Sequence, residues 1–432
     1  REIYMHNLDI TMDHISKVEG SAGLEVRVRD NKVEHVHFKI TEYKRFYTEA
    51  MKGKPILGLP QLLARICGTC SNAHIMASIE ACEKALGIVP SEQTRLLRIL
   101  TMYGLMIRDH ALHLYLFTMP DLFNRDSFLD FDENNPKEHQ LLHDAFEIKA
   151  AGNALATIIA GRSVHAPYPV IGGFTHFPAK KEIVETQEKI KKIRPAVLRL
   201  IKIFEKCDFH FDRKTDFVAM VPERYGFLNG CIDSGKGDCL PEQYFGNFLE
   251  RVVLPYSQAS AYKHGGKPYM VGALARMNLA KERLHNETKK SLKETLDLFP
   301  STDIYYNNLA QAIEILHSID DAIDILENNE FKEEPLIKKP YRDGMGIGVV
   351  EAPRGTLYHK VEVGADGIVK SGEIVVPTGQ NQINIEEDIW RLVDELIPET
   401  PKEKIEYEIE KLIRAYDPCM SCAAHFLEVK WM

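Results

Sequence analysis

The alternation of apolar and polar residues predicts two β-hairpin regions. Over residues 8–41 apolar side chains recur at every second position, as in residues 24–28, and a polar turn at residues 29–31 separates two such runs. Residues 343–378 alternate in the same way and contain a hairpin over residues 356–376. The glycines that open this second region are not followed by the Lys-Ser/Thr of a phosphate loop, so we expect a strand there.

Between the two hairpin regions, apolar residues recur with the period of an α-helix. This period predicts a helical core over residues 60–330, in which one helix begins at the N-cap Ser91. A further helix opens near Pro401, with one apolar face, and ends at Asp417. Other helices are predicted over residues 137–161, 179–206 and 304–328. The expected fold class is α+β, with a mainly α-helical bundle core and peripheral antiparallel β-hairpins.

Composition and charge exclude two kinds of partner. The 54 basic and 63 acidic residues give a formal charge of −9, and no dense Lys/Arg stripe is present, so nucleic acid is a poor candidate. No run approaches the roughly 18 consecutive apolar residues of a membrane span, so we expect no direct membrane span. The first residues show no secretory pattern, and a cytoplasmic location is expected.

Two cysteine pairs carry the candidate chemistry. Cys67 and Cys70 lie near the start of the chain and Cys419 and Cys422 near its end, and the spacing within each pair can turn both thiols to one side of a tight turn. A zinc ribbon closes its second pair within roughly 15–20 residues, so a local zinc module is disfavoured. From the residues alone, four thiolates suit a structural zinc ion, an iron–sulfur cluster or a redox metal site. The other four cysteines are expected to be inert thiols, namely Cys82, Cys207, Cys231 and Cys239.

The distance between the two pairs also bears on domain organisation. A chain of 432 residues would ordinarily suggest about three domains. Because the cysteines of both chain ends must meet at one site, we expect a single interwoven domain over residues 1–432. Its parts are the N-terminal hairpin at 8–41, the helical core at 60–330, the hairpin region at 343–378, and the C-terminal helix with the metal-binding motif at 384–432.

The two cysteine motifs together resemble those of a known family. Arg-x-Cys-Gly-x-Cys-x-x-x-His runs from Arg65 to His74, and Asp-Pro-Cys-x-x-Cys-x-x-His runs from Asp417 to His425. In this order and at opposite chain ends, they resemble the large, catalytic subunit of nickel-iron hydrogenases, most closely the soluble, cofactor-coupled (bidirectional) groups. The resemblance begins at Val18 and implies heterolytic cleavage and formation of dihydrogen.

The resemblance implies a role for each cysteine of the two motifs. Cys67 and Cys419 are implied as terminal nickel ligands, and Cys70 and Cys422 as bridges to an iron that carries carbon monoxide and two cyanides. Glu19 matches the glutamate that carries protons to and from a nickel-bound thiolate. A terminal thiolate such as that of Cys419 is then the first proton acceptor and Glu19 the second.

Further residues match the family's surroundings of the metal pair. Arg354, beside Pro353 and held by Asp109 and Asp417, is implied as a fixed positive charge over the open site. Asp109 belongs to a charged triplet inside an apolar helix, which must be paired or line a polar cavity. The hydroxyl of Thr378 is implied as a hydrogen-bond donor to a cyanide. His74 is expected to orient a sulfur from the second coordination shell.

A second metal site, for magnesium or iron, is also implied by the resemblance. Its ligands in the family are an upstream glutamate, a backbone carbonyl and the final histidine, here Ile374 for the carbonyl and His425. The expected spacing before Cys67 falls on Thr48, with Glu49 adjacent, so either Glu49 serves after a shift of one residue or Thr48 replaces the carboxylate. Maturation in the family usually removes the residues after the histidine, but we expect the tail at 426–432 to be retained and ordered.

The implied reaction needs partners and has rivals. The chain has no dinucleotide fingerprint and no ferredoxin-type cysteine run, so electrons must leave through a partner with iron–sulfur clusters. The resemblance implies that this partner is an iron–sulfur small subunit, with further flavin or iron–sulfur electron-transfer subunits beyond it. Iron–sulfur clusters are then expected only in partner subunits. One rival is a non-catalytic scaffold like the quinone-site subunit of respiratory complex I, which lacks the cysteines. The other is a metal-stabilised structural protein, which would not need the surrounding Glu, Arg and Asp.

Overall fold

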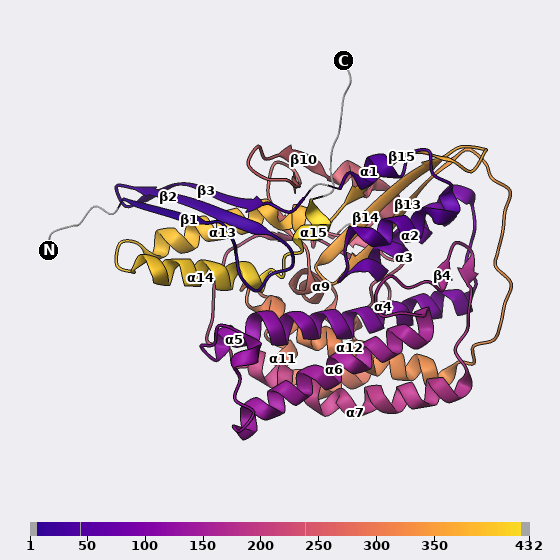
Figure 1. Cartoon of the computed structure of the whole chain (residues 1–432), viewed down its shortest axis with the longest axis horizontal. Coiled ribbons are helices and arrows are strands. Elements are labelled where there is room, and N and C mark those ends of the chain that lie inside the picture. Colours follow the sequence, from indigo (N-terminus) through magenta and orange to yellow (C-terminus); the bar gives the residue numbers. More distant parts are fainter. Residues whose placement is uncertain (1–6, 44, 238, 425–432) are drawn as a thin grey trace, which may run out of the picture.

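Long helices form one layer of the molecule, and the sheets lie on one side of this layer (Figure 1). The computed structural model describes residues 7–43, 45–237 and 239–424. In the lower half of Figure 1 four helices pack against one another: α4 (Glu92–Leu112), α6 (Pro136–Ala160), α7 (Lys180–Glu205) and α12 (Tyr306–Asn328). The Ser91 hydroxyl accepts the Thr94 N–H at 3.0 Å and caps α4 as predicted. The α+β class with a helical core is confirmed.

The N-terminal hairpin is a three-stranded antiparallel sheet formed by β1 (Leu8–Met12), β2 (Ala22–Arg29) and β3 (Lys32–Ile40). Asp30 and Asn31 close the predicted turn with φ of 50° and 58°. The apolar face of the sheet is buried, and β3 packs against α13 (Pro377–Leu396). The sheet therefore leaves one face polar, as its alternating sequence requires.

The second sheet holds the helix that follows the first cysteine pair. It is formed by β13 (Gly344–Ala352), β14 (Gly355–Val363) and β15 (Val369–Val375), and α3 (Ser71–Leu86) lies against β13. Gly344, Gly346 and Gly348 face α3, and a Cβ on each would overlap a backbone carbonyl oxygen of that helix. The glycine-rich stretch thus serves close packing of a strand on a helix rather than phosphate binding.

The segment from 207 to 300, which showed little pattern, contains short strands and helices. They are β6 (Asp216–Phe217), β7 (Ala219–Val221), β8 (Cys231–Asp233), β9 (Cys239–Pro241), α8 (Phe245–Phe248), β10 (Glu250–Val253), β11 (Ser260–Lys263), β12 (Tyr269–Met270), α9 (Ala273–Ala280), α10 (Asn286–Ser291) and α11 (Lys293–Leu296). The expectation of inert thiols is wrong for Cys231 and Cys239, which form a disulfide. The pairing of β8 with β9 brings their Cα atoms to 5.5 Å, within the range a disulfide needs.

Short helices and strands complete the chain. They are α1 (Tyr47–Ala50), α2 (Leu59–Leu63), α5 (Met119–Leu122), β4 (Pro169–Val170), β5 (Gly173–Phe174), α14 (Lys402–Ala415) and α15 (Met420–Ala423). The segments around Glu19 and Cys419 meet in an isolated β-bridge, in which the Glu19 carbonyl accepts the Met420 N–H at 3.0 Å. The assignment of one interwoven domain stays a prediction. Within the described ranges, none of the helices combines the length and apolar character that crossing a membrane requires.

Gly346→Ala tests the close packing of β13 on α3. The new Cβ would overlap the carbonyl oxygen of Ala81, and backbone cannot yield as a flexible side chain does. We expect the free energy of unfolding to fall by about 1–3 kcal/mol or more, as for overpacked cores. Gly58→Ala is the matched control, because nothing lies within 4 Å of its added Cβ. Equal thermal unfolding midpoints for the two variants would contradict this account.

Candidate metal centre

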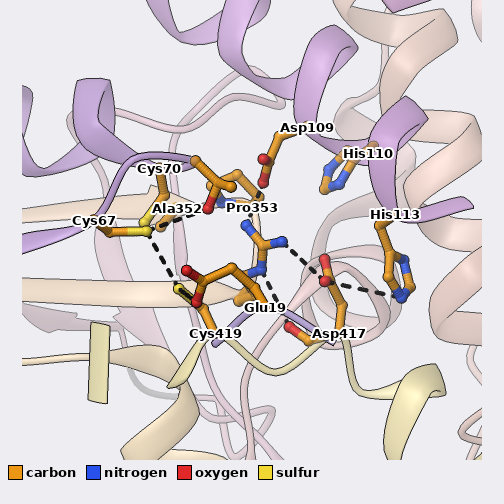
Figure 2. Close-up of polar contacts among 12 residues, drawn as sticks. Glu19, Cys67, Cys70, Asp109, His110, His113, Ala352, Pro353, Asp417 and Cys419 are labelled. Atoms are coloured by element: carbon orange, nitrogen blue, oxygen red, sulfur yellow. Dashed lines mark hydrogen bonds and ion pairs between the residues drawn. The ribbon is translucent and has the colours of Figure 1, made fainter. Parts of the chain in front are cut away.

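The four predicted cysteines converge at one buried site. Figure 2 shows three of them, Cys67, Cys70 and Cys419, beside Glu19. The Sγ atoms of Cys67 and Cys419 lie 3.4 Å apart, those of Cys70 and Cys422 2.9 Å apart, and all four lie within 4.8 Å of one another. Cys70 directly precedes α3, Cys419 directly precedes α15, and Cys422 lies within α15. The predicted convergence of the two pairs is therefore confirmed.

A side chain that sequence reasoning missed joins the two cysteine segments. One guanidinium nitrogen of Arg45 donates to the carbonyl oxygens of Ile66, at 2.7 Å, and Ser421, at 2.9 Å. These carbonyls directly precede Cys67 and Cys422 in the sequence. The Tyr47 hydroxyl adds a bond of 2.7 Å to the Arg65 carbonyl in the first motif. Arg45 carries no motif of its own, so only its contacts reveal this role.

The donor set fits a metal ion. Burial raises the pKa of the Cys419 and Cys422 thiols, and the neighbouring sulfurs add to this effect for Cys419. Four buried thiolates in contact would repel one another, so a cation must be present for all of them to be ionised. Sulfur donors at this density select soft or borderline transition metals. The site therefore has the chemistry of a thiolate-bound metal centre.

His74 lies against this sulfur cluster. Its Nε2 is 3.5 Å from the Cys422 Sγ, and its Nδ1 is 3.1 Å from the Nε2 of His359. Burial lowers the pKa of His74 to about 4, so the ring is neutral at neutral pH. A neutral ring fixed from both sides can orient a sulfur without adding charge, which is the geometry expected for His74.

Glu19 contacts the sulfur of Cys419. The Cys419 thiol donates to Glu19 Oε2 at 3.0 Å, and the Ser421 N–H donates to the same oxygen at 3.1 Å. Burial raises the pKa of the Glu19 carboxyl, and the charge of the Cys67 thiolate raises it further. A carboxyl with a raised pKa, in hydrogen-bond contact with a thiol, can exchange a proton with it.

Arg354 is a buried cation between two carboxylates. Its Nη1 pairs with Asp109, and its Nη2 pairs with Asp417 Oδ1 at 2.9 Å. Burial would lower the pKa of Arg354, but the charges of Asp109 and Asp417 outweigh it and raise the pKa. Gln311, which the sequence did not single out, donates to the second Asp417 oxygen at 2.9 Å. The guanidinium is thereby fixed in place and remains charged.

Pro353 and Thr378, two further residues predicted for the site, each accept a hydrogen bond near it. The Pro353 carbonyl accepts a bond of 3.1 Å from the buried Arg276, which is itself paired with Glu314 and Glu351. Thr378 stands in the first turn of α13, and its Oγ1 accepts the Cys419 N–H at 2.8 Å. Thr378 thus fixes the backbone at a cysteine and keeps its own hydroxyl proton available.

The residues named for a second metal site are only partly brought together. The helix α1, which carries Thr48 and Glu49, packs against β15, which carries the buried Ile374. The Glu49 carboxylate is engaged at the surface by Lys52 at 2.7 Å. His425 and the tail at 426–432 lie outside the described residues. The choice between Thr48 and Glu49 and the retention of the tail stay predictions.

Comparison with known proteins identifies the family. The family model "Nickel-dependent hydrogenase" matches residues 47–143 and 250–425. The chain is 31% identical to the alpha subunit of sulfhydrogenase 1 of Pyrococcus furiosus, over 98% of this chain and 99% of that protein. It is 33% identical to the alpha subunit of sulfhydrogenase 2 of the same organism, over 97% of this chain and 100% of that protein.

Solved structures show the same fold. The chain of an NAD+-reducing [NiFe]-hydrogenase in the H2-reduced state superposes with a TM-score of 0.86 at 23% identity, covering 97% of this chain and 100% of that chain. The Ni-Fe-Se hydrogenase from D. vulgaris Hildenborough gives a TM-score of 0.81 at 23% identity, with the same coverage. With the four buried cysteines fitting a nickel-iron centre, the chain belongs to the nickel-dependent hydrogenase family and is a catalytic large subunit that acts on dihydrogen.

Proposed function

We propose that this subunit cleaves and forms dihydrogen heterolytically, with Cys67 and Cys419 as terminal nickel ligands and Cys70 and Cys422 as bridges to iron. The observation that carries the proposal is the set of four buried Sγ atoms within 4.8 Å of one another. When bound, the metal pair supplies the redox chemistry and the Lewis acidity that activate dihydrogen. A scaffold without catalysis would not need this set of four thiols.

Cys419 and Glu19 form the first steps of the proposed proton path. The Cys419 thiolate takes the proton released on cleavage and passes it to Glu19, whose Oε2 lies 3.0 Å from the sulfur. The raised pKa of the Glu19 carboxyl, caused first by burial, brings it closer to the pH at which a relay works in both directions. The Ser421 N–H holds this oxygen toward the sulfur.

Arg354 supplies the proposed fixed charge beside the open position of the site. Because Asp109 and Asp417 hold the guanidinium from two sides, it needs no reorganisation during turnover. Pro353, the residue before it, presets the backbone that presents this side chain. A buried, oriented cation stabilises negative charge that develops near the thiolates more than a solvated one does.

The iron is proposed to carry carbon monoxide and two cyanides, with Thr378 contacting one cyanide. The Thr378 Oγ1 already accepts the Cys419 N–H at 2.8 Å, so its hydroxyl proton is left to donate. Cyanide nitrogen is an acceptor and matches this donor. His74, whose Nε2 lies 3.5 Å from the Cys422 sulfur, is proposed to orient that bridging thiolate.

We also propose a magnesium or iron ion at a second site near the C-terminus. Its protein ligands are the Ile374 carbonyl, His425 and either Glu49 or Thr48. The packing of α1 on β15 supports placing Glu49 or Thr48, on α1, near the Ile374 carbonyl, on β15. To bind the metal, the Glu49 carboxylate would have to give up its ion pair with Lys52. The hydroxyl of Thr48 offers a neutral oxygen without breaking an ion pair. An oxygen-rich donor set suits a hard cation such as magnesium.

Electrons are proposed to leave through an iron–sulfur small subunit, and from there to pass to further flavin or iron–sulfur subunits. The names of the relatives support a partner, since both sulfhydrogenase chains are named as alpha subunits. The similarity of fold to an NAD+-reducing hydrogenase supports the soluble, cofactor-coupled group, which would place the enzyme in the cytoplasm. The chain itself holds no sequence run for an iron–sulfur cluster.

Metal analysis with infrared spectroscopy tests the proposed centre. We expect about one nickel per chain in the active protein and absorption bands of carbon monoxide and cyanide. Cys67→Ser should abolish both nickel retention and dihydrogen turnover, because a hydroxyl is a poor ligand for soft metals. Cys82→Ser is the matched control, because this buried cysteine lies outside the group of four. Zinc in place of nickel would refute the proposal.

Glu19→Gln tests the proton path. The amide cannot carry a proton, so turnover and isotope exchange should fall by ~10²-fold or more, while nickel content and the infrared bands stay unchanged. Glu138→Gln is the control, because Glu138 is a buried carboxylate outside the cysteine site that pairs with Arg125 at the start of α6. Near-normal isotope exchange in Glu19→Gln would mean that protons leave by another route.

Arg45→Gln tests the clamp between the two cysteine segments. Loss of a guanidinium that bonds the Ile66 and Ser421 carbonyls should loosen the site, so we expect faster nickel loss to a chelator and broader infrared bands. Arg29→Gln, which breaks an exposed pair with Asp9, is the control. A variant with wild-type nickel retention and unchanged bands would show that Arg45 does not position the ligands.

A further inference from the structure

A second group of metal-binding side chains lies on the polar face of the N-terminal sheet. The register of β2 and β3 places Glu25 opposite His37 and Arg27 opposite His35. Side chains directly opposite each other in an antiparallel pair share a face, so Glu25, His35 and His37 project on the same side. The intervening residues, such as Val26, are buried on the other face. Strand pairing alone thus gathers two imidazoles and a carboxylate.

We propose that Glu25, His35 and His37 form a binding site for a divalent transition-metal ion of the zinc class. The potential ligand atoms of the three side chains all lie within 4.8 Å of one another. The His37 Nδ1 lies 3.9 Å from Glu25 Oε2, and the two imidazole centroids are 4.6 Å apart. Ligand atoms bound to one tetrahedral zinc ion lie about 3.5 Å from each other. Because the two imidazole planes are only 17° from parallel, the ring of His35 must turn so that its nitrogen points at an ion bound by His37.

The donor set differs from that of the cysteine centre. Two imidazoles and one carboxylate suit zinc and its neighbours in the first transition row, whereas the four thiols favour softer metals. Three protein ligands also leave one tetrahedral position for water, which is typical of sites that exchange their ion or ligand. The zinc site therefore depends neither on the hydrogenase reaction nor on the roles proposed for the cysteines.

The ring of His37 is held in position by the neighbouring ring of Tyr256. It stacks on the ring of Tyr256, with centroids 4.0 Å apart and an interplanar angle of 18°. The Tyr256 hydroxyl donates to Glu386, which also accepts the Phe38 N–H at 2.9 Å. The first ligand is therefore ordered before the ion arrives.

Lys39 competes with a metal ion for the carboxylate of Glu25. Its ammonium pairs with Glu25 Oε1, so an incoming cation must displace it or use the other carboxylate oxygen. Arg27 adds positive charge in the same row and is partly neutralised by Asp9 at 3.7 Å. The affinity of the site is thus set by an exchange of one cation for another. Removal of the Lys39 ammonium should therefore strengthen metal binding.

Zinc binding to the purified holoenzyme tests the proposal. After equilibrium dialysis at graded free zinc, metal analysis should find one zinc per chain beyond the metals of the untreated enzyme. His35→Asn and His37→Asn should each weaken this binding by at least ~10²-fold, since losing even a supporting partner costs about 10–100-fold. Lys39→Gln should tighten it several-fold, because the competing ammonium is gone. Dihydrogen turnover should be unchanged in all three variants.

A matched control separates a built site from general surface binding. His143, with Glu147 3.5 Å away on α6, offers one imidazole and one carboxylate but belongs to none of the groups of three or more potential ligands among the described residues. His143→Asn should leave zinc binding unchanged, and the thermal midpoint of each variant without zinc checks that it is folded. The proposal is overturned if the wild type binds no additional zinc, or if the additional zinc survives both His35→Asn and His37→Asn.

Discussion

The contact between two thiol pairs from opposite chain ends is the constraint on which the rest of the structure depends. Cys67 and Cys419 are separated by most of the sequence, yet their sulfurs lie 3.4 Å apart in a buried site. Contacts of the surrounding backbone and of one side chain help to hold the two segments together. The bridge of Glu19 to Cys419 and the two carbonyl bonds of Arg45 do so, and both tie N-terminal segments to the C-terminal motif. The close packing of α3 on β13 then fixes the position of the Cys67 and Cys70 pair.

Charge balance is the second consequence of this burial. A single buried thiolate is costly, and four are possible only with a cation. Arg354 contributes one positive charge but is itself shared by Asp109 and Asp417, so it does not neutralise the sulfurs. Removing one carboxylate would still leave the guanidinium paired with the other, so the second carboxylate is not needed to balance its charge. The trio is therefore better explained by orientation of the guanidinium than by its contribution to stability.

The sequence predicts those features that repeat locally or match a motif. Alternation finds the strands around Asp30 and Asn31, the N-cap signal finds Ser91, and the cysteine motifs find the metal centre with Glu19 and Arg354. Features that depend on contact between distant segments cannot be predicted in this way. Arg45 and Gln311 have no periodic signal, and the disulfide of Cys231 and Cys239 depends on how β8 and β9 pair. The helical period predicts no helix between the second hairpin region and Pro401, yet α13 (Pro377–Leu396) forms there and packs against β3.

The unequal tolerance of core and site explains how the fold persists at low identity. The chain superposes on a hydrogenase chain with a TM-score of 0.86 although only 23% of residues are identical. Cores accept many apolar exchanges if volume and pattern are kept, so most of α4, α6, α7 and α12 can change. The site cannot change in the same way, because a displacement of even about 1 Å would misplace a sulfur or a guanidinium. The few contacts between distant segments that hold the site therefore tolerate less displacement than the apolar positions of the helices do.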